Sequence, residues 1–545
     1  MKDNFRASLR SEPRYRLGEA ILIDFALTNV SDQDIALLTW NTPLETQDEV
    51  LSYFQVHYGD ALVPYDGRFV KRGEPDERSY RLISAGATVV ETVDLTTAYG
   101  ITVPGTYTVT LDARIADAFT QDEDAPRSRR REDHQGFDFD PVSTTFEVVG
   151  DGEPRYTVAE KERSKLGGPQ APSASLVAAK LTAMAPVIVG GTAARQQEVR
   201  TAHENAGAFA EASMQQLVWT AGSANTLSAE WFGTHDAGRY ATVKQHFTDI
   251  SAVVAGQALT YDLTGAGCQP SWYAYTYKNT RKIWLCSNFW PAEATGTDSK
   301  FGVLVHELSH AVSSTDDLAY GQTGARNLAA TTPADAIRNA DNHEYFAETH
   351  ADRVITAPVV WNNGKAYMFV AGKYYQYDIG NDKVDPGFPQ PIKPNWPGLF
   401  PDRVDAGVVW PDGNAYFFRG SQYVRYDIAA DKVPPGYPLP ISPYWPGLWS
   451  DGIDAAVVWP DGNAYFFRGS QYVRYDIAAD KVPPGYPLPI SPYWPGLWPG
   501  GLTGGVVWPD GNAYFFRGSE YVRYEIATDT ASAPKPVSPN WPGLP

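Results

Sequence analysis

The sequence predicts a multidomain chain with a β-sandwich, then a mainly α (α+β) domain, then a four-bladed β-propeller. Three observations support this prediction. The 545 residues are more than one hydrophobic core can serve. The apolar pattern changes from strict alternation near the N-terminus to helical spacing in the middle. The C-terminal third is a repeat array.

Residues 1–150 read as strands. The segments AILIDFALTNV, TVVETVDLTTAY and GTYTVTLDARI alternate apolar and polar residues, with Gly, Pro and Asp between them. Strands at this spacing indicate a small immunoglobulin-like sandwich. Residues 151–185 are polar and rich in Gly, Pro and Ser, which predicts a linker open to proteolytic nicking.

Residues 186–352 have mostly helical patterns. The segment ARQQEVRTAHENAGAFAEASMQQLVW carries apolar residues at three- and four-residue spacing. A short β region follows around YAYTYKNTRKIWLC. Two more helical stretches come after GTDSK and through ADNHEYFAETHADRV. The sequence therefore predicts an α+β domain dominated by helices.

Residues 353–545 repeat a unit that opens on a tryptophan every 49 residues, at Trp361, Trp410, Trp459 and Trp508. Within a unit, AYFFRG and QYVRYDI read as two strands joined by a Gly-Ser turn. Four units of four short strands predict a four-bladed propeller. Because one blade cannot bury both of its faces alone, the four blades are expected to close a ring.

The net charge of −19 disfavours nucleic acid and anionic membranes as partners and attracts basic substrates. That the acidity only keeps the protein soluble is an open alternative. The sequence contains no run of 18 apolar residues, so no membrane span is predicted, and no signal peptide is visible at the N-terminus. Cys268 and Cys286, 18 residues apart, suit one local disulfide in an oxidising compartment; two free buried thiols are the alternative.

The segment FGVLVHELSHAV carries the strongest chemical signal. His306 and His310 stand at i and i+4, which places both imidazoles on one face of a helix where they can hold one Zn²⁺. Glu307 lies beside them and can act as the base for water, whose pKa the ion lowers toward about 7. A helix with two surface histidines is the alternative interpretation.

A catalytic zinc needs a third protein ligand, and residues 313–321 read S-S-T-D-D-L-A-Y-G. This run resembles the G-T-x-x-D-x-x-Y-G signature of the aspzincin zinc peptidases, the deuterolysin and peptidyl-Lys metalloendopeptidase group. The resemblance implies a zincin catalytic domain with Asp317 as third ligand and Tyr320 as donor to the oxyanion of the tetrahedral intermediate. Asp316 is the competing ligand. Ser313 and Ser314 replace the opening Gly-Thr.

The resemblance is to the peptidyl-Lys branch, from WFGTHD through GTDSKFGVLVHELSH to DNHEYFAE, over about 160 residues. It implies that Asp341 and Glu344 bind the ammonium of a lysine that follows the scissile bond. On a helix, i and i+3 carboxylates can converge on one cation. Ordinary surface acids are the alternative. The Cys268–Cys286 pair matches one disulfide of this group.

The N-terminal segments WNTPLE, YDGRFVKRGEP and VDLTTAYGITVPGTYTV resemble the pro-region of these peptidases, which implies folding assistance or latency. Cleavage at Lys161, Lys165 or Lys180 in the linker could release this pro-domain, by the enzyme itself or by another protease. The C-terminal units resemble hemopexin-type blades. That resemblance implies docking to a protein or matrix partner and a structural cation among the channel carbonyls.

Five further histidines are predicted to be structural: His203, His235, His246, His343 and His350. The expected function is that of a secreted zinc endopeptidase that cuts proteins before lysine. Two alternatives stay open: a binding or adhesion protein whose propeller is the main module, and a surface protein with an inactive metal site.

Overall fold

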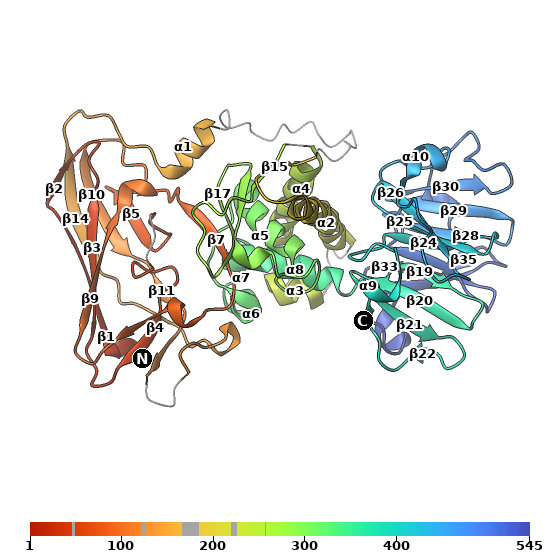
Figure 1. Ribbon diagram of the computed structural model, residues 1–545, viewed down its shortest axis with the longest axis horizontal. Helices are drawn as coiled ribbons and strands as arrows, with labels where there is room; N and C mark the ends of the chain where they lie inside the picture. Colours follow the sequence, from red (N-terminus) through yellow and green to blue (C-terminus); the bar gives the residue numbers. More distant parts are fainter. Residues whose placement is uncertain (46–48, 122–125, 166–184, 220–225, 257) are drawn as a thin grey trace. The chain divides into compact units, whose positions relative to one another are not determined.

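The computed structural model describes residues 1–45, 49–121, 126–165, 185–219, 226–256 and 258–545. These residues form two compact units (Figure 1). The first comprises Met1–Ala292 and Lys300–Phe346, and the second Glu293–Ser299 and Ala347–Pro545. The N-terminal strands and the metal-binding motif therefore belong to the same unit.

Two sheets of the N-terminal region enclose one hydrophobic core that includes Leu9, Phe25, Val109 and Phe146. Buried and exposed residues alternate along their strands, as the sequence predicts. The three-stranded sheet has the order β1 (Phe5–Ser11), β3 (Leu22–Asn29), β9 (Thr88–Asp94). The five-stranded sheet has the order β2 (Arg14–Arg16), β14 (Ser143–Val149), β10 (Gly105–Leu111), β5 (Phe54–Tyr58), β6 (Ala61–Val63).

Smaller elements complete this region. A third sheet joins β12 (Ala118–Thr120), β4 (Ile35–Leu38) and β8 (Tyr80–Ile83), and a fourth joins β11 (Arg114–Ile115) and β13 (Phe137–Asp138). Helix α1 (Val158–Lys165) forms inside the predicted linker. Its Ala159 enters the N-terminal core, and Arg163 pairs with Asp66 at 2.6 Å. Lys161 and Lys165 lie exposed on α1, whereas Lys180 lies outside the described residues.

Helices dominate the region from residue 186 onward, as expected. They are α2 (Ala193–Trp219), α3 (Thr226–Phe232), α4 (Ala237–Gly256), α5 (Lys300–Ser313), α6 (Gly321–Thr331), α7 (Pro333–Ala336) and α8 (Ala340–Ala351). Helix α5 packs against α2 and α4, and its residues from Phe301 to Ala311 are all buried. The motif helix is therefore the centre of this region rather than a surface helix.

The sheet beside these helices includes a strand from the N-terminal region. Its order is β15 (Val187–Val189), β16 (Thr260–Asp262), β18 (Lys282–Leu285), β17 (Trp272–Tyr277) and β7 (Arg68–Arg72). Strand β7 pairs antiparallel with β17 at the edge, as Figure 1 shows. The predicted disulfide between Cys268 and Cys286 is present and joins the loop before β17 to the end of β18. The sequence pattern had placed β7 in the N-terminal sandwich.

The second unit contains four sheets, one for each sequence repeat. The first sheet comprises β19 (Thr356–Val360), β20 (Lys365–Val370), β21 (Lys373–Asp378), β22 (Lys383–Val384) and β23 (Gln390–Pro391). The second comprises β24 (Ala406–Val409), β25 (Asn414–Arg419), β26 (Gln422–Asp427) and β27 (Leu439–Pro440), and the third β28 (Ala455–Val458), β29 (Asn463–Arg468), β30 (Gln471–Asp476) and β31 (Leu488–Pro489). The fourth comprises β32 (Gly504–Val507), β33 (Ala513–Arg517), β34 (Glu520–Glu525), β35 (Thr530–Ala531) and β36 (Lys535–Pro536). One short helix follows in each repeat: α9 (Ile392–Asn395), α10 (Ile441–Tyr444), α11 (Ile490–Tyr493) and α12 (Val537–Asn540).

Neighbouring sheets of the second unit share hydrophobic cores. The first and last also do so, since Met368 and Phe516 belong to one cluster with Trp541. The innermost strands β19, β24, β28 and β32 line one cavity with Val, Ala, Gly and Pro residues. A cation bound by carbonyls in this cavity stays a prediction. Among the described residues, no helix is long and apolar enough to cross a membrane.

Candidate metal centre

Helix α5 presents two imidazoles from one face. His306 and His310 are one helical turn apart, both are fully buried, and their Nε2 atoms lie 3.1 Å apart. The Nδ1 of His310 lies 2.9 Å from the carbonyl oxygen of Thr315, which fixes the ring so that Nε2 is available to a metal. The sequence spacing therefore produces the convergence expected from it.

Asp317 completes a three-donor cluster. Its Oδ1 lies 3.2 Å from the Nε2 of His306 and 3.1 Å from that of His310. Ligands at 2.0–2.2 Å in a tetrahedral zinc site are roughly 3.3 Å apart, so this donor set fits zinc in spacing and in chemistry. Asp316 points elsewhere, because it pairs with Lys278 and Arg338 at 2.6 Å each.

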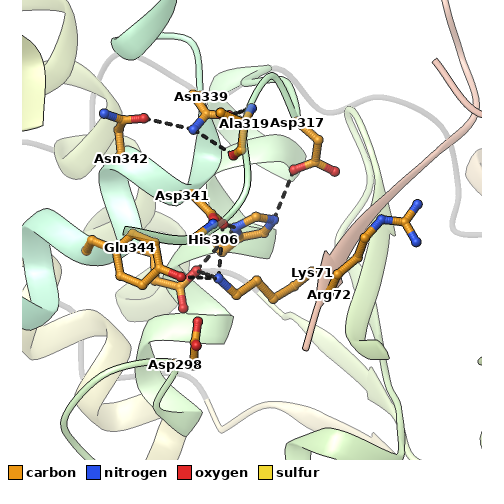
Figure 2. Close-up of polar contacts among 12 residues, drawn as sticks. Lys71, Arg72, Asp298, His306, Asp317, Ala319, Asn339, Asp341, Asn342 and Glu344 are labelled. Atoms are coloured by element: carbon orange, nitrogen blue, oxygen red, sulfur yellow. Dashed lines mark hydrogen bonds and ion pairs between the residues drawn. The ribbon is translucent and has the colours of Figure 1, made fainter. Parts of the chain in front are cut away.

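Asn339 holds the loop that carries Asp317, a role that the sequence analysis missed. Its Oδ1 accepts hydrogen bonds from the backbone N–H groups of Leu318 (2.8 Å) and Ala319 (3.1 Å). Its Nδ2 donates to the side chain of Asn342, as Figure 2 shows. The amide of Asn342 donates in turn to the backbone of α3 and α6. Asn339 just before α8 and Asn342 in its first turn thus hold the loop in place.

The charges at the centre stabilise one another. Burial acts to raise the pKa of Asp317, but His310 and His306 outweigh it and hold that pKa well below its usual range. Burial acts to lower the pKa of His306, but Asp317, Asp341 and Glu344 outweigh it and raise that pKa. A dense set of partly neutralised charges of this kind is typical of a functional site.

Glu307 follows the first imidazole and is fully buried. Burial, together with the charges of Asp317 and Glu344, raises its pKa to about 8, while His306 and the N–H of Lys71 act in the opposite direction. Its Oε1 accepts a hydrogen bond from that N–H at 3.1 Å. Its Oε2 is buried and has no hydrogen-bond partner within the described part of the chain. One oxygen is thus left for a further partner, such as water.

Asp341 and Glu344 converge on a single cation, and that cation is Lys71 of strand β7. The Nζ of Lys71 lies 3.0 Å from Oδ1 of Asp341 and 2.7 Å from Oε2 of Glu344. It also donates to the hydroxyl of Tyr345 at 3.2 Å. All three charged side chains are buried, and Figure 2 shows them converging. Burying an ammonium is costly unless it is paired, so this pocket is built for a lysine side chain.

Asp341 also connects this pocket to the metal centre. Its Oδ1 lies 2.9 Å from Nδ1 of His306, on the side of the ring that faces away from Asp317. Its Oδ2 accepts a hydrogen bond from the backbone N–H of Gly321 at 2.6 Å. A carboxylate behind a metal-binding imidazole fixes its tautomer and orientation. The same side chain therefore serves the lysine pocket and His306.

Strand β7 lies directly over the metal centre. The N–H of Val70 donates to Oδ2 of Asp317 at 2.9 Å, and the ring of Phe69 stacks on His310 at 4.6 Å between centroids. The segment YDGRFVKRGEP resembles a pro-region, but nothing in its pattern distinguishes Lys71 from Arg68 and Arg72 beside it in the strand.

Tyr320 lies at the other end of β7. Its ring is 5.5 Å from the guanidinium of Arg72 and 6.1 Å from the ring of Trp40, both from the N-terminal region. Burial and the charge of Asp317 raise its pKa, although Arg72 counteracts them. The phenol is therefore protonated at neutral pH and able to donate a hydrogen bond.

The five other histidines have structural surroundings. Nδ1 of His246 lies 3.0 Å from Nε2 of His343, and Nδ1 of His203 lies 3.0 Å from the hydroxyl of Tyr261. His235 packs edge-on against Tyr240, and burial lowers the pKa of His350 to about 4. Within the described ranges, the groups of three residues able to hold a metal contain neither these histidines nor Asp316.

Comparison with known proteins agrees with this geometry. The family model described as lysine-specific metallo-endopeptidase matches residues 219–348. The hemopexin model matches residues 355–400, 404–450, 453–499 and 506–545. An extracellular protease of Aeromonas hydrophila is 32% identical over 333 residues, which cover 60% of this chain and 88% of that protein.

Fungal relatives match the catalytic part more closely. The peptidyl-Lys metalloendopeptidase of Pleurotus ostreatus is 42% identical over 166 residues, 30% of this chain and 96% of that protein. The solved zinc peptidase from Grifola frondosa is 35% identical and aligns with 29% of this chain and 97% of its own, with a TM-score of 0.28. Given these matches, the chain is a metalloendopeptidase that belongs to the lysine-specific metallo-endopeptidase, or aspzincin, family and carries four C-terminal hemopexin repeats.

Proposed function

We propose that this protein is a secreted zinc endopeptidase that cuts on the amino side of lysine and is latent while its N-terminal domain is in place. The observation that carries this proposal is Lys71, which occupies the acidic pocket while its backbone N–H faces Glu307. A substrate cut before lysine would likewise place a lysine side chain in the acidic pocket and the backbone nitrogen of that lysine next to Glu307.

The proposed chemistry assigns one role to each group. His306, His310 and Asp317 would hold zinc, which when bound would supply Lewis acidity for the attack of water on the peptide carbonyl. Glu307 accepts the proton of the water and delivers it to the nitrogen that leaves. The position of this nitrogen corresponds to that of Lys71, 3.1 Å from Oε1. Tyr320 donates a hydrogen bond to the developing oxyanion.

Selection of lysine rests on Asp341 and Glu344. Two buried carboxylates without a cation are unfavourable, so a substrate that brings an ammonium gains energy that a neutral residue cannot supply. Peptide mapping tests this assignment. A protein mixture digested by the active enzyme should give new fragments that begin with lysine, and 1,10-phenanthroline should stop the digestion. New N-termini spread over many residue types would contradict the lysine pocket but not the zinc chemistry.

Latency follows from the same strand. With β7 in the cleft, an external peptide cannot pair with β17 or reach the acidic pocket. Replacing Lys71 by alanine should therefore increase cleavage of an external lysine peptide by the intact full chain, because the strand loses its buried ion pairs. The control is Lys2→Ala, whose side chain is exposed and pairs only on the surface with Asp140. Equal activity of Lys71→Ala and the unaltered chain, both uncleaved on a gel, would exclude this role.

Secretion is part of the proposal. It is supported by the Cys268–Cys286 disulfide, which persists in oxidising compartments, and by the name of the Aeromonas relative. Detection of the protein with this bond intact in culture fluid of the producing cells is the expected result, and retention of all of it inside the cells is the contrary one.

We propose in addition that the hemopexin repeats close into a four-bladed propeller and dock on a protein or matrix partner. Tyr444 and Tyr493, at equivalent places in α10 and α11, are 52% and 53% exposed, and large exposed aromatic groups favour binding. The first and last repeats have Asn395 and Asn540 at this place. Changing both tyrosines to asparagine should weaken retention on an insoluble protein matrix without altering hydrolysis of a short peptide.

A further inference from the structure

On the proposed function, β7 takes the place of an extended substrate, so each of its residues marks a position at which a substrate residue would bind. It pairs antiparallel with β17, and its Lys71 fills the lysine pocket. The bond between Val70 and Lys71 takes the place of the scissile bond. Arg72 then stands directly after the lysine, and Arg68 stands third before the bond.

Side chains of a strand alternate between its two faces, so Phe69 and Lys71 point one way and Arg68, Val70 and Arg72 the other. Phe69 and Lys71 meet His310 and the acidic pocket. The face that carries Arg68 and Arg72 contacts aromatic rings instead. The lysine pocket does not account for these contacts.

Both arginines lie against rings of β17. The guanidinium carbon of Arg68 is 4.9 Å from the centroid of the Tyr275 ring and 5.8 Å from that of Trp272. That of Arg72 is 5.7 Å from the Trp272 ring. Cations within about 6 Å of an aromatic face are attracted to it, most strongly to tryptophan. Trp272 thus serves two cations, one on each side of the proposed cleavage point.

Further contacts on the catalytic side favour positive charge. Nη1 of Arg68 donates to the carbonyl oxygen of Gly267 at 3.0 Å, in the loop held by the disulfide. Arg72 also faces the ring of Tyr320 at 5.5 Å. Each of these groups lies outside the N-terminal region and so remains when that region is displaced by a substrate.

The N-terminal region adds one carboxylate to each arginine. Glu49 pairs with Arg68 at 3.0 Å, and Glu45 accepts from Nη2 of Arg72 at 2.9 Å. These acids balance the two charges in the latent form. A substrate would bring its arginines without them, and the ring faces and the carbonyl would then act alone in a strongly acidic protein of net charge −19.

We propose that Trp272 and Tyr275 form a second specificity site, which selects a cationic side chain directly after the lysine and another at the third position before the cut. The preferred substrates are therefore segments in which lysine lies among other basic residues. This inference rests on the proposed function, since it takes cleavage before lysine as given.

The experiment starts from the full chain and uses it after incubation has relieved the proposed latency, as verified by casein hydrolysis that 1,10-phenanthroline stops. The probe is a blocked peptide with the chain's own sequence Arg-Phe-Val-Lys-Arg-Gly. Two further peptides carry citrulline in place of one arginine or the other, which keeps the shape and removes the charge. Each citrulline should lower kcat/KM for cleavage before lysine by about three- to ten-fold, the range expected for one cation–ring contact.

Variants at Tyr275 test whether its ring selects the arginine at the position of Arg68. Tyr275→Leu should reduce the preference for arginine at the position of Arg68, with the Trp272 ring still present, whereas Tyr275→Phe should keep the full preference, because it loses the same hydroxyl bond to Ala266 but retains the ring. The peptide comparison on the unaltered enzyme needs no variant and decides the question even if Tyr275→Leu fails to fold.

The outcomes separate the two proposals. Equal kcat/KM for the arginine and citrulline peptides, with cleavage still before lysine, overturns the second specificity site and leaves the proposed function intact. It would mean that the arginines serve only to hold the N-terminal domain through Glu45 and Glu49. Cleavage at bonds unrelated to lysine overturns the proposed function and this inference with it.

Discussion

Glu307 is a buried carboxylate that follows the proposed zinc ligand His306 and accepts a hydrogen bond from the backbone of β7. Its identity follows from the H-E-x-x-H spacing, and its raised pKa follows from burial among other acids. The sequence could supply the first fact but not the second, because burial depends on helices and strands that are distant along the chain.

Replacing Glu307 by glutamine should lower kcat by about 10²–10⁴, the usual contribution of a general base. Zinc content should stay unchanged, since His306, His310 and Asp317 remain. Hydrolysis of a lysine peptide and metal analysis of the purified chain measure the two effects. The control is Glu211→Gln on the exposed surface of α2. Full activity of Glu307→Gln would rule out the assigned role.

Neutral replacements of Asp341 and Glu344 should have different effects on zinc binding and on the selection of lysine. Asp341 lies 2.9 Å from Nδ1 of His306, and Glu344 lies 3.3 Å from it. We therefore expect Asp341→Asn to weaken zinc binding by about 10- to 100-fold, the usual cost of losing a carboxylate behind a ligand, and also to reduce lysine selection. Glu344→Gln should mainly raise KM for lysine peptides. Chelator competition and peptide kinetics separate the effects, and equal zinc loss in both variants would contradict this division.

Other residues of the site could not be predicted from the sequence. Asn339 accepts hydrogen bonds from the backbone N–H groups of Leu318 and Ala319, and nothing in the sequence around Asn339 indicates that role. Lys71 required the knowledge that residue 71 reaches a helix near residue 344. By contrast, Asp317 could be chosen over Asp316 because its distance to Tyr320 matches the aspzincin signature.

At the scale of elements, the sequence pattern predicted the helical stretches that contain α2, α5 and α8. It could not predict that β7 leaves the sandwich. The pairing of β7 with β17 joins residues far apart in sequence, and an alternating strand fits either sheet equally well. The helix α1 was also missed, since its sequence is polar and its stability comes from Ala159 and Arg163 docking on the N-terminal core.

The contact between α4 and α8 should make the first unit sensitive to acid. His246 and His343 face one another, and burial lowers the pKa of His246 to about 4 and that of His343 well below its usual value. The unfolded chain thus binds more protons than the folded one below about pH 6.5. We expect stability to fall as pH falls from about 6.5 toward 4. Urea unfolding of His246→Gln should show a smaller loss over this window, and an unchanged loss would exclude the pair as a cause.

At the scale of the whole molecule, the chain divides into two compact units, and only the first holds the proposed zinc ligands. Calorimetry of the full chain should therefore show two transitions. Removal of the metal by a chelator should lower the Tm of one transition, because a ligand stabilises only the unit that binds it. The Tm of the hemopexin repeats should stay unchanged. A single transition, or equal shifts of two, would contradict independent units.

Strand β7 completes the sheet beside the proposed metal centre, and the ribosome makes it before the other strands of that sheet. Arg72 precedes its neighbour Trp272 by 200 residues, and at 5–20 residues per second translation needs roughly 10 to 40 s to cross that interval. Strand β7 is thus already made when the helices that carry the proposed zinc ligands leave the ribosome. If β7 blocks the site as proposed, the site forms with its inhibitor in place, and a newly made molecule has no interval in which it could digest the cell that produces it.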